Sequence, residues 1–413
     1  MQIDTTQRKV SLDIRDPDFY GDPYPSYREL QERCPMFYWQ EHGIWTFVSH
    51  QDVFSLLRDR RLGRQISHLK SRDELGLPPV AAQHQPFFDI DNLSMLASEP
   101  PMHTRLRSLV QKAFVAREVA GLEARIESLC GELIVDIREK FRQGAESVDL
   151  LREYATPIPV TIIADLLGVP RDNCDDLLKW SHAMVQMYEM QRTPAMENQA
   201  VRASQEFVAF LRDYIAFRRS RLGDDLISHL IQVEEAGEKL TEDELIANCI
   251  LLLNAGHEAT VNVIGNGMLA LLENPDQAAL WRQGNVPSEL AVEELLRFDT
   301  PLHQFNRWVL EPLEINGQQF EVGQEVALLL GAANRDPEVF VEPDTLRLGR
   351  QPNPHVSFGG GIHFCLGAAL ARLEVSIAFD KILNQLPNLR LADTSRFKNS
   401  YHFRGLESLL VNI

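Results

Sequence analysis

A glycine-dense turn followed by a single cysteine, FGGGIHFCLG at residues 358–367, constrains this chain more than any other segment. Gly359, Gly360 and Gly361 permit positive φ and close backbone approach, which suits a tight loop. After Cys365 the sequence LGAALARL is a strong helix former, so the cysteine is expected at or near a helix N-terminus. Backbone amides and the helix dipole favour an ionised sulfur there. The segment is therefore predicted to hold a thiolate, with a buried structural cysteine as the common alternative.

The remaining cysteines give no sign of a shared framework. Cys34, Cys130, Cys174 and Cys249 are scattered, and with Cys365 they make an odd total of 5 without CxxC spacing. Neither a disulfide framework nor a cysteine zinc site is indicated.

Charge narrows the classes of partner. The formal net charge of −18 argues against nucleic acid or an anionic membrane as the main partner. The first residues, MQIDTTQRKVSLDIRDPDFY, contain no apolar run that suits a signal peptide or an anchor. We expect a cytoplasmic protein that uses neither nucleic acid nor membrane and is a monomer. At 413 residues, one large domain and two or three ordinary ones are both compatible with the length.

The cysteine segment matches a known spacing. Phe, Gly, any, Gly, any, His, any, Cys, any, Gly is met at each fixed position by Phe358, Gly359, Gly361, His363, Cys365 and Gly367. This resembles the haem-binding loop of the cytochromes P450, and the resemblance extends from about residue 14 to the C-terminus. It implies a cytochrome P450 fold, mainly α with a smaller β-rich region, as a single domain over residues 1–413, with the first 13 or so residues a candidate for disorder. It also implies haem b, with Cys365 as the iron ligand.

A long apolar helix should lie at the centre of such a fold. Thr241 and Glu244 form a capping-box signature, and no proline follows until Pro275, so about 33 residues could span roughly 50 Å. Its middle reads AGHEAT, residues 255–260. A lone glutamate on a helix usually faces solvent, but the resemblance implies that Ala255 and Gly256 lie against haem and that Glu258 and Thr260 handle protons.

The chain departs from the family pattern within this helix. The residue directly after the acid, usually a threonine in the family, is Ala259, and the hydroxyl comes one position later at Thr260. These two positions lie about 100° apart around a helix. We therefore expect protons to arrive through water held by Glu258 and Thr260, or with help from a polar group of the substrate.

Other site residues follow from the resemblance. His103 and Arg107, four apart on a helix expected over residues 99–114, and Arg307 at the start of a strand are the implied propionate ligands. Glu294, Arg297 and Arg350 are the implied buried network behind the cysteine loop. An isolated Glu-x-x-Arg pair would be a common surface feature of little value.

Further elements are readable from local patterns. Residues 37–39 and 44–48 are predicted to form a hairpin, as are the strands on either side of Asn316 and Gly317. Helices are expected over residues 118–141 and 160–167, and two more over residues 171–221 that are broken around Thr193 and Pro194. Residues 69–101 are predicted to be irregular.

The substrate region is the least determined part of the chain. Methionine-rich stretches more often fill a core than line a pocket. The resemblance nevertheless implies an apolar pocket lined by Phe87, Phe88, Met95, Met184, Met187, Leu302, His303, Gln304 and Phe305, with His303 and Gln304 able to anchor a polar end.

The implied reaction is monooxygenation of a small apolar substrate by O2, as hydroxylation or epoxidation. Electrons would come from a separate ferredoxin and its NAD(P)H-dependent reductase, with Lys112 and Arg372 as candidate docking cations. A peroxide-using or non-oxygenating enzyme of the same fold is the first alternative, because of Ala259. A non-catalytic haem-binding protein is the second.

Overall fold

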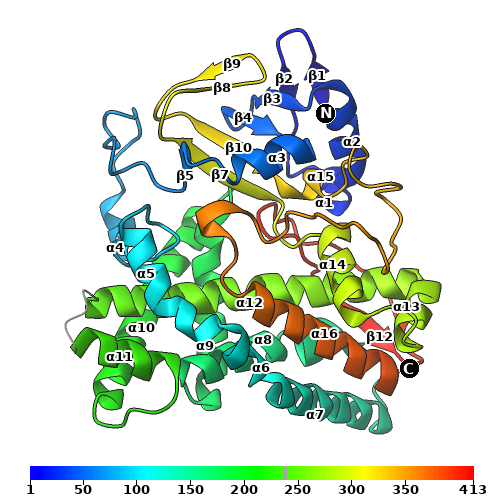
Figure 1. Cartoon of the computed structure of the whole chain (residues 1–413). Coiled ribbons are helices and arrows are strands. Elements are labelled where there is room, and N and C mark those ends of the chain that lie inside the picture. The colour runs from blue at the N-terminus through cyan, green and yellow to red at the C-terminus, as the bar shows by residue number, and fades with distance from the viewer. Residues whose placement is uncertain (236–239) are drawn as a thin grey trace. The chain divides into compact units, whose positions relative to one another are not determined.

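The computed structural model describes residues 1–235 and 240–413 and separates into two compact units. Unit 1 comprises residues 1–69, 125–156 and 259–413, and unit 2 comprises the described parts of 70–124 and 157–258. Helices dominate both units, and every strand of the described residues belongs to unit 1 (Figure 1). This composition confirms the mainly α fold with a smaller β-rich region. The single domain over residues 1–413 stays a prediction.

The main sheet of unit 1 has seven strands in the order β1-β2-β3-β4-β10-β7-β5. The strands β3 and β4 pair antiparallel, which confirms the first hairpin. Strand β2 pairs with both β1 and β3 and buries Val10, so residues 2–11 are part of the main sheet in this structure. The bounds are β1 Gln2–Asp4, β2 Lys9–Ser11, β3 Met36–Trp39, β4 Ile44–Phe47, β5 Leu62–Gly63, β7 Gln304–Val309 and β10 Glu325–Leu329.

Two smaller sheets complete the β region. The strands β8 (Leu313–Ile315) and β9 (Gln318–Phe320) form the second predicted hairpin. Its turn residues Asn316 and Gly317 have φ of 51° and 78°, the left-handed values that an Asn-Gly turn supplies. The third sheet pairs β11 (Arg390–Leu391), β12 (Leu410–Asn412) and β6 (Val148–Asp149).

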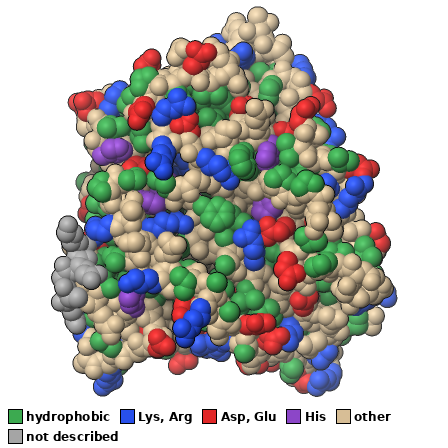
Figure 2. All heavy atoms as spheres, viewed as in Figure 1, with side chains coloured by type: hydrophobic (Ala, Val, Ile, Leu, Met, Phe, Trp, Pro, Cys, Tyr) green, Lys and Arg blue, Asp and Glu red, His purple; other side chains and the backbone are tan. Residues whose placement is uncertain are grey.

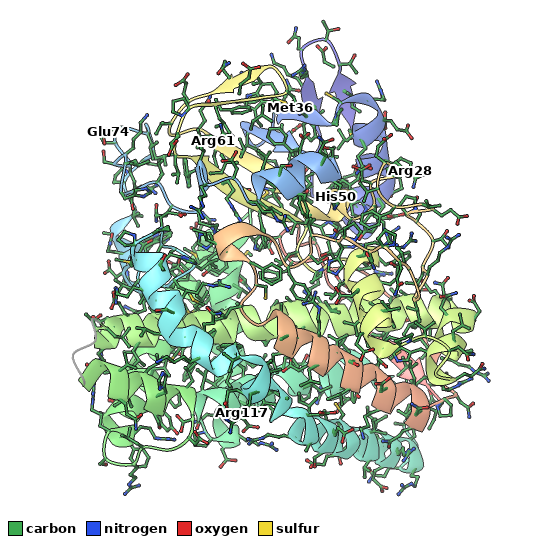
Figure 3. All side chains as sticks on the ribbon, in the orientation of Figure 1. Arg28, Met36, His50, Arg61, Glu74 and Arg117 are labelled. Carbon is green, nitrogen blue, oxygen red and sulfur yellow. The ribbon has the colours of Figure 1, made fainter. Side chains whose placement is uncertain are left out.

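Helices cover the main sheet and build the rest of unit 1. An apolar core that includes Phe47, Val53, Leu328 and Leu330 joins α3 (His50–Leu56) and α15 (Leu330–Ala333) to the strands. His50, labelled in Figure 3, begins α3, and its Nε2 lies 2.8 Å from the carbonyl oxygen of Pro354. The other helical elements are α1 Pro17–Gly21, α2 Tyr24–Arg33, α7 Glu123–Arg142, η3 Leu151–Ala155, α13 Pro275–Arg282, α14 Ser288–Phe298, η6 Gly361–His363 and α16 Ala368–Gln385.

Unit 2 is a layer of helices in which α10 packs against both α9 and α4. Thr193 caps α10 by accepting a hydrogen bond from the Met196 N–H at 3.3 Å, which confirms the predicted break. The bounds are η1 Ala82–His84, α4 Gln85–Asp91, α5 Met102–Val110, η2 Gln111–Phe114, α6 Ala116–Ala120, α8 Pro157–Leu167, η4 Arg171–Asn173, α9 Cys174–Val185, η5 Gln186–Tyr188, α10 Pro194–Arg218 and α11 Leu226–Glu235.

Two sequence-based boundaries need correction. Residues 69–101, predicted to be irregular, contain η1 and α4, because the apolar Phe87 and Ile90 share a buried helix face. The helix expected over residues 118–141 is divided into α6 and α7.

The long helix α12 spans Glu242–Glu273, close to the expected length, and contributes residues to both units. The capping box is confirmed, since the Thr241 N–H donates to Glu244 Oε2 at 2.9 Å and the Glu244 N–H donates to Thr241 Oγ1 at 3.2 Å. Among the described residues, no helix combines the length and the apolar character that crossing a bilayer requires. Acidic and basic side chains are interspersed on the face shown in Figure 2.

Candidate active site

The cysteine loop has the backbone that its glycines allow. Gly359 and Gly361 have φ of 70° and 67°, and the Cys365 N–H donates to the Phe358 carbonyl at 3.0 Å. Gly367 is the N-cap of α16, so Cys365 precedes the helix rather than lying within it. Its side chain is half-buried. The expected position near a helix N-terminus is thus confirmed.

Close packing and positive φ explain why positions 359 and 361 are glycine. A Cβ at Gly361 would lie 2.6 Å from the Leu57 carbonyl oxygen, just beyond the end of α3. A Cβ at Gly359 would lie 3.1 Å from Cε2 of Phe305 on β7. A side chain at Gly361 would therefore push the loop away from the end of α3, and one at Gly359 would push it away from Phe305 on β7.

The other four thiols are poor candidates for a metal ligand. Burial raises the pKa of Cys130 to about 11 and that of Cys249 to about 12. Burial also raises the pKa of Cys34 and of Cys174. Because a thiolate is the metal-binding form, these four environments disfavour it.

The predicted charged network is present and fully buried. Glu294 and Arg297 on α14 form a bidentate pair with distances of 2.7 and 2.8 Å. Arg350 Nε lies 3.1 and 3.0 Å from the two oxygens of Glu294. Both arginines also donate to backbone carbonyls. Arg297 donates to the Asn334 carbonyl, and Arg350 donates to the Val341 carbonyl.

Asn334 connects this network to the cysteine loop, which sequence reasoning missed. Its Oδ1 accepts from the Val356 N–H at 2.8 Å, and its Nδ2 donates to Ser357 Oγ at 2.8 Å. Ser357 Oγ donates in turn to the Leu296 carbonyl on α14. The segment ANRDP, residues 333–337, was the available signal, but the sequence alone does not tell which partner its amide would take.

A second charged cluster flanks the loop and was also missed. Glu293 accepts hydrogen bonds from Arg372 at 2.9 Å and lies 2.9 Å from His355 Nε2. Burial alone would raise the pKa of Glu293, but hydrogen bonds from Arg372 and His355 hold it at about 2. The Arg372 guanidinium also lies 4.4 Å from the ring centroid of Phe358. Arg372, a candidate docking cation, is therefore engaged inside unit 1.

Strand β7 and the residue pair before it carry several predicted residues. Arg307 is buried and donates to the Asn306 carbonyl at 2.9 Å. Gln304 donates to Asn306 Oδ1 at 2.7 Å, and Phe305 packs against the core of the sheet. Leu302 forms an isolated bridge with Phe403.

His303 is buried among aromatic rings, and its Nδ1 lies 2.8 Å from the hydroxyl of Tyr27. Burial, assisted by Arg404 and Arg335, lowers the pKa of His303 well below its usual value. Its role as an anchor for a polar end of the substrate stays a prediction.

In unit 2, α5 places His103 and Arg107 one turn apart. His103 is buried and Arg107 is half-buried. Arg105, between them, forms an ion pair with Glu244 near the start of α12. This pair fixes α5 against the first turn of α12 within unit 2.

The middle of α12 is helical throughout, and its polar residues are buried. Glu258 is 8% exposed and Thr260 is 5% exposed. Glu258 Oε2 lies 3.5 Å from His182 Nε2 on α9 and 3.4 Å from His257 Nε2. A Cβ at Gly256 would lie 3.5 Å from Ile163, an ordinary contact, so packing within unit 2 does not require this glycine; Ala255 is exposed.

The apolar candidates of unit 2 are mostly buried. The ring of Phe87 contacts Phe88 and Tyr188 at centroid distances of 5.3 and 6.4 Å. The Met95 N–H donates to Asn248 Oδ1 on α12 at 3.1 Å. Met184 and Met187 are 1% and 6% exposed.

Comparison with known proteins places the chain in a family. The cytochrome P450 family model matches residues 76–283 and 289–406. The chain therefore belongs to the cytochrome P450 family, an oxidoreductase family.

Named relatives extend the match to nearly the whole chain. Cytochrome P450 107B1 of Saccharopolyspora erythraea is 40% identical over 416 residues, covering 98% of this chain and 99% of that protein. The polyketide biosynthesis cytochrome P450 PksS of Bacillus subtilis is 35% identical over 408 residues, covering 96% and 97%. The solved structure of epothilone D-bound P450epoK superposes with a TM-score of 0.88 at 29% identity, covering 97% and 98%.

Family membership implies a haem cofactor, and the cysteine loop fits one. Its sulfur lies on a half-buried loop before a helix, while burial raises the pKa of the other four thiols.

Proposed function

We propose that this protein is a haem-thiolate monooxygenase that inserts one oxygen atom from O2 into a small apolar substrate, by hydroxylation or epoxidation. Electrons would come from a separate ferredoxin and an NAD(P)H-dependent reductase. The observation that carries the proposal is the Cys365 loop, with positive φ at Gly359 and Gly361, joined through Asn334 to the buried Glu294 network.

The cofactor is proposed to be haem b. Cys365 would bind the iron, and bound haem would supply the activation of dioxygen. His103, Arg107 and Arg307 would bind the propionates, and the other proposed contacts are Ala255, Gly256, Phe358, Gly359, His363 and Gly367. Glu294, Arg297 and Arg350 would support the cysteine loop indirectly, since Arg297 donates to the Asn334 carbonyl and the Asn334 side chain bonds Val356 and Ser357 just before the loop.

Proton supply is proposed to rest on Glu258 and Thr260. Both side chains are buried in the middle of α12, whereas Ala259 has no group that could hold a proton or a water molecule. Ordered water held by the carboxylate and the hydroxyl would then carry protons.

An apolar substrate is supported by the side chains and by relatives. The buried Phe87, Met184 and Met187 offer apolar and adaptable surface. Relatives at 36% and 33% identity are named vitamin D(3) 25-hydroxylase and 6-deoxyerythronolide B hydroxylase, and these names support hydroxylation as the reaction.

The direct test is to titrate purified holoprotein with terpenoids, fatty acids and macrolactones and to follow the haem spectrum from low to high spin. A compound that shifts the spectrum is then supplied with ferredoxin, reductase, NAD(P)H and 18O2. One 18O atom per product molecule is expected. Product formed with hydrogen peroxide alone, and not with the ferredoxin system, would instead favour the peroxide-using alternative that Ala259 suggests.

A further inference from the structure

Three potential metal ligands converge in unit 2 outside the cysteine loop. His182 on α9 and His257 and Glu258 on α12 each offer one donor atom, and these atoms all lie within 4.8 Å of one another. In the residues that the structure describes, 1–235 and 240–413, this is the one group of three such side chains that meets this criterion. Two imidazoles and one carboxylate form a donor set that suits zinc and its neighbours in the first transition row.

The separations of the donor atoms match a small ion. Zinc binds nitrogen and oxygen at about 2.0–2.1 Å in tetrahedral geometry, which places neighbouring donor atoms about 3.3–3.4 Å apart. Glu258 Oε2 lies 3.4 Å from His257 Nε2 and 3.5 Å from His182 Nε2. Both separations from the carboxylate oxygen are therefore close to what one shared ion requires, and the two imidazole donors lie within 4.8 Å of each other.

His257 is oriented as a metal-binding histidine would be. Its Nδ1 lies 3.2 Å from the Leu253 carbonyl oxygen, which can only accept, and 3.3 Å from Ser181 Oγ, which can donate or accept. A hydrogen bond to Leu253 requires the proton on Nδ1, and Ser181 can accept from the same N–H. In the neutral ring Nε2 then presents a lone pair toward Glu258. A backbone carbonyl that fixes the tautomer in this way is the usual support of a histidine ligand.

His257 also supplies an independent sign of a missing partner. Its side chain is 0% exposed, and its Nε2 has no hydrogen-bond partner among the described residues. A buried polar atom without a partner is costly, and a bound ion would remove that cost.

The site is open to solvent through His182. Its side chain is 47% exposed, while those of His257 and Glu258 are 0% and 10% exposed. The two rings lie within 13° of parallel with centroids 5.1 Å apart, so His182 would turn about its side-chain bonds to direct Nε2 at the shared ion.

We propose that His182, His257 and Glu258 form a binding site for a divalent transition metal ion, separate from the cysteine loop, that joins α9 to α12. A fourth position would be filled by water, as in open zinc sites. Elsewhere in the part of the chain that the structure describes, histidine–carboxylate contacts lack a third ligand: His84 lies 3.6 Å from Glu197, and His355 lies 2.9 Å from Glu293, beside an arginine.

Occupancy would bear on turnover, an extension that rests on the proposed function. Glu258 is the acid proposed to hold the proton-carrying water, and a carboxylate that binds a cation is a weaker base. Zinc bound here should therefore slow turnover without removing haem.

The binding test uses holoprotein and zinc alone. Parent protein is dialysed against micromolar Zn2+ with a competing chelator, and zinc and iron per chain are measured by mass spectrometry. We expect one zinc per chain, and at least about 10- to 100-fold weaker binding in His182→Ala and in His257→Ala. His84→Ala is the matched control and should bind as the parent does.

His182 is largely exposed, so its substitution tests the site even if His257→Ala fails to fold. Zinc-edge X-ray absorption should show nitrogen and oxygen neighbours and no sulfur. Equal zinc binding by the parent and His182→Ala, or sulfur in the zinc shell, would overturn the site.

The turnover arm separates the site from the proposed function. Zinc that inhibits the parent but not His182→Ala supports both. Zinc that binds in the parent with the expected ligands, yet leaves turnover unchanged, would support the site and contradict the proton role of Glu258.

Discussion

Two buried glutamates, Glu294 and Glu258, show how differently one side chain can be used. Glu294 is bound by two arginines, by the Arg347 N–H and by Asn353, and no part of its carboxylate lacks a donor. Glu258 instead faces two imidazoles at 3.4 and 3.5 Å. The first carboxylate is fixed by its surroundings and serves structure, whereas the second can exchange a proton or accept an ion. The kind of partner, arginine for Glu294 and imidazole for Glu258, rather than burial, distinguishes the two roles.

The largest effect is expected from replacing Cys365, the residue on the loop that the Glu294 network supports. Cys365→Ser should abolish the thiolate signature, so that the reduced carbon monoxide complex loses its red-displaced band and turnover falls at least about 1,000-fold. Absorption spectra and product analysis measure both. Cys174→Ser is the control, and retention of the red-displaced band in Cys365→Ser would refute the assignment.

The next largest effect is expected from Glu294 itself. Glu294→Ala leaves two buried arginines without their anion, which should cost about 3–5 kcal/mol and yield protein without haem. Urea unfolding and the haem-to-protein ratio check this. The exposed pair of Glu139 and Arg142 supplies the control, since Glu139→Ala should change the free energy of unfolding by less than about 0.5 kcal/mol. Equal losses in the two variants would remove the distinction drawn above.

A third buried glutamate, Glu374, tests what burial itself does to the pKa of a carboxyl. Burial raises the pKa of Glu374 on α16 from 4.5 to about 8. The folded protein therefore holds a proton that the unfolded chain releases, and this carboxyl lowers stability as pH rises from 4.5 to 8. Glu374→Gln should therefore raise the free energy of unfolding more at pH 8 than at pH 5. The difference between the two effects should be on the order of 2–4 kcal/mol.

Denaturant unfolding of parent and variant at both pH values measures that difference. An equal effect of Glu374→Gln at pH 5 and pH 8 would show that the carboxyl is ionised in the folded state.

The smallest effect is expected at Thr260, which is proposed to hold the proton-carrying water together with Glu258. Thr260→Val keeps the size of the side chain and removes its hydroxyl, so product formed per NAD(P)H consumed should fall about 2- to 10-fold while haem content stays constant. Ala259→Thr is the matched variant and should raise this ratio. Unchanged coupling in Thr260→Val, together with equal turnover of a substrate that lacks polar groups, would exclude the proposed water route.

The sequence predicted those features that depend on local pattern. Both hairpins, the break before α10, the long α12 and the near-terminal position of Cys365 follow from turn residues, caps and periodicity. The Glu294 network was predicted because resemblance supplied its members. Features that join distant segments were missed: Asn334 binds Val356, and His182 meets Glu258 across 76 residues, as its neighbour Ser181 meets His257. The contact between His303 and Tyr27 was missed as well, because nothing in the local sequence indicates this partner.

Gly361 lies close to the Leu57 carbonyl. The N-terminal part of the chain therefore has a role beyond supplying strands to the main sheet. The end of α3 lies against residues 359–361 and limits the shapes that this segment can take. At the start of the same helix, His50 Nε2 lies 2.8 Å from the Pro354 carbonyl oxygen. A fragment that begins after residue 58 would retain the whole motif and still lack the surface that gives it form. The conformation of residues 359–361 thus depends on a helix about 300 residues earlier in the chain.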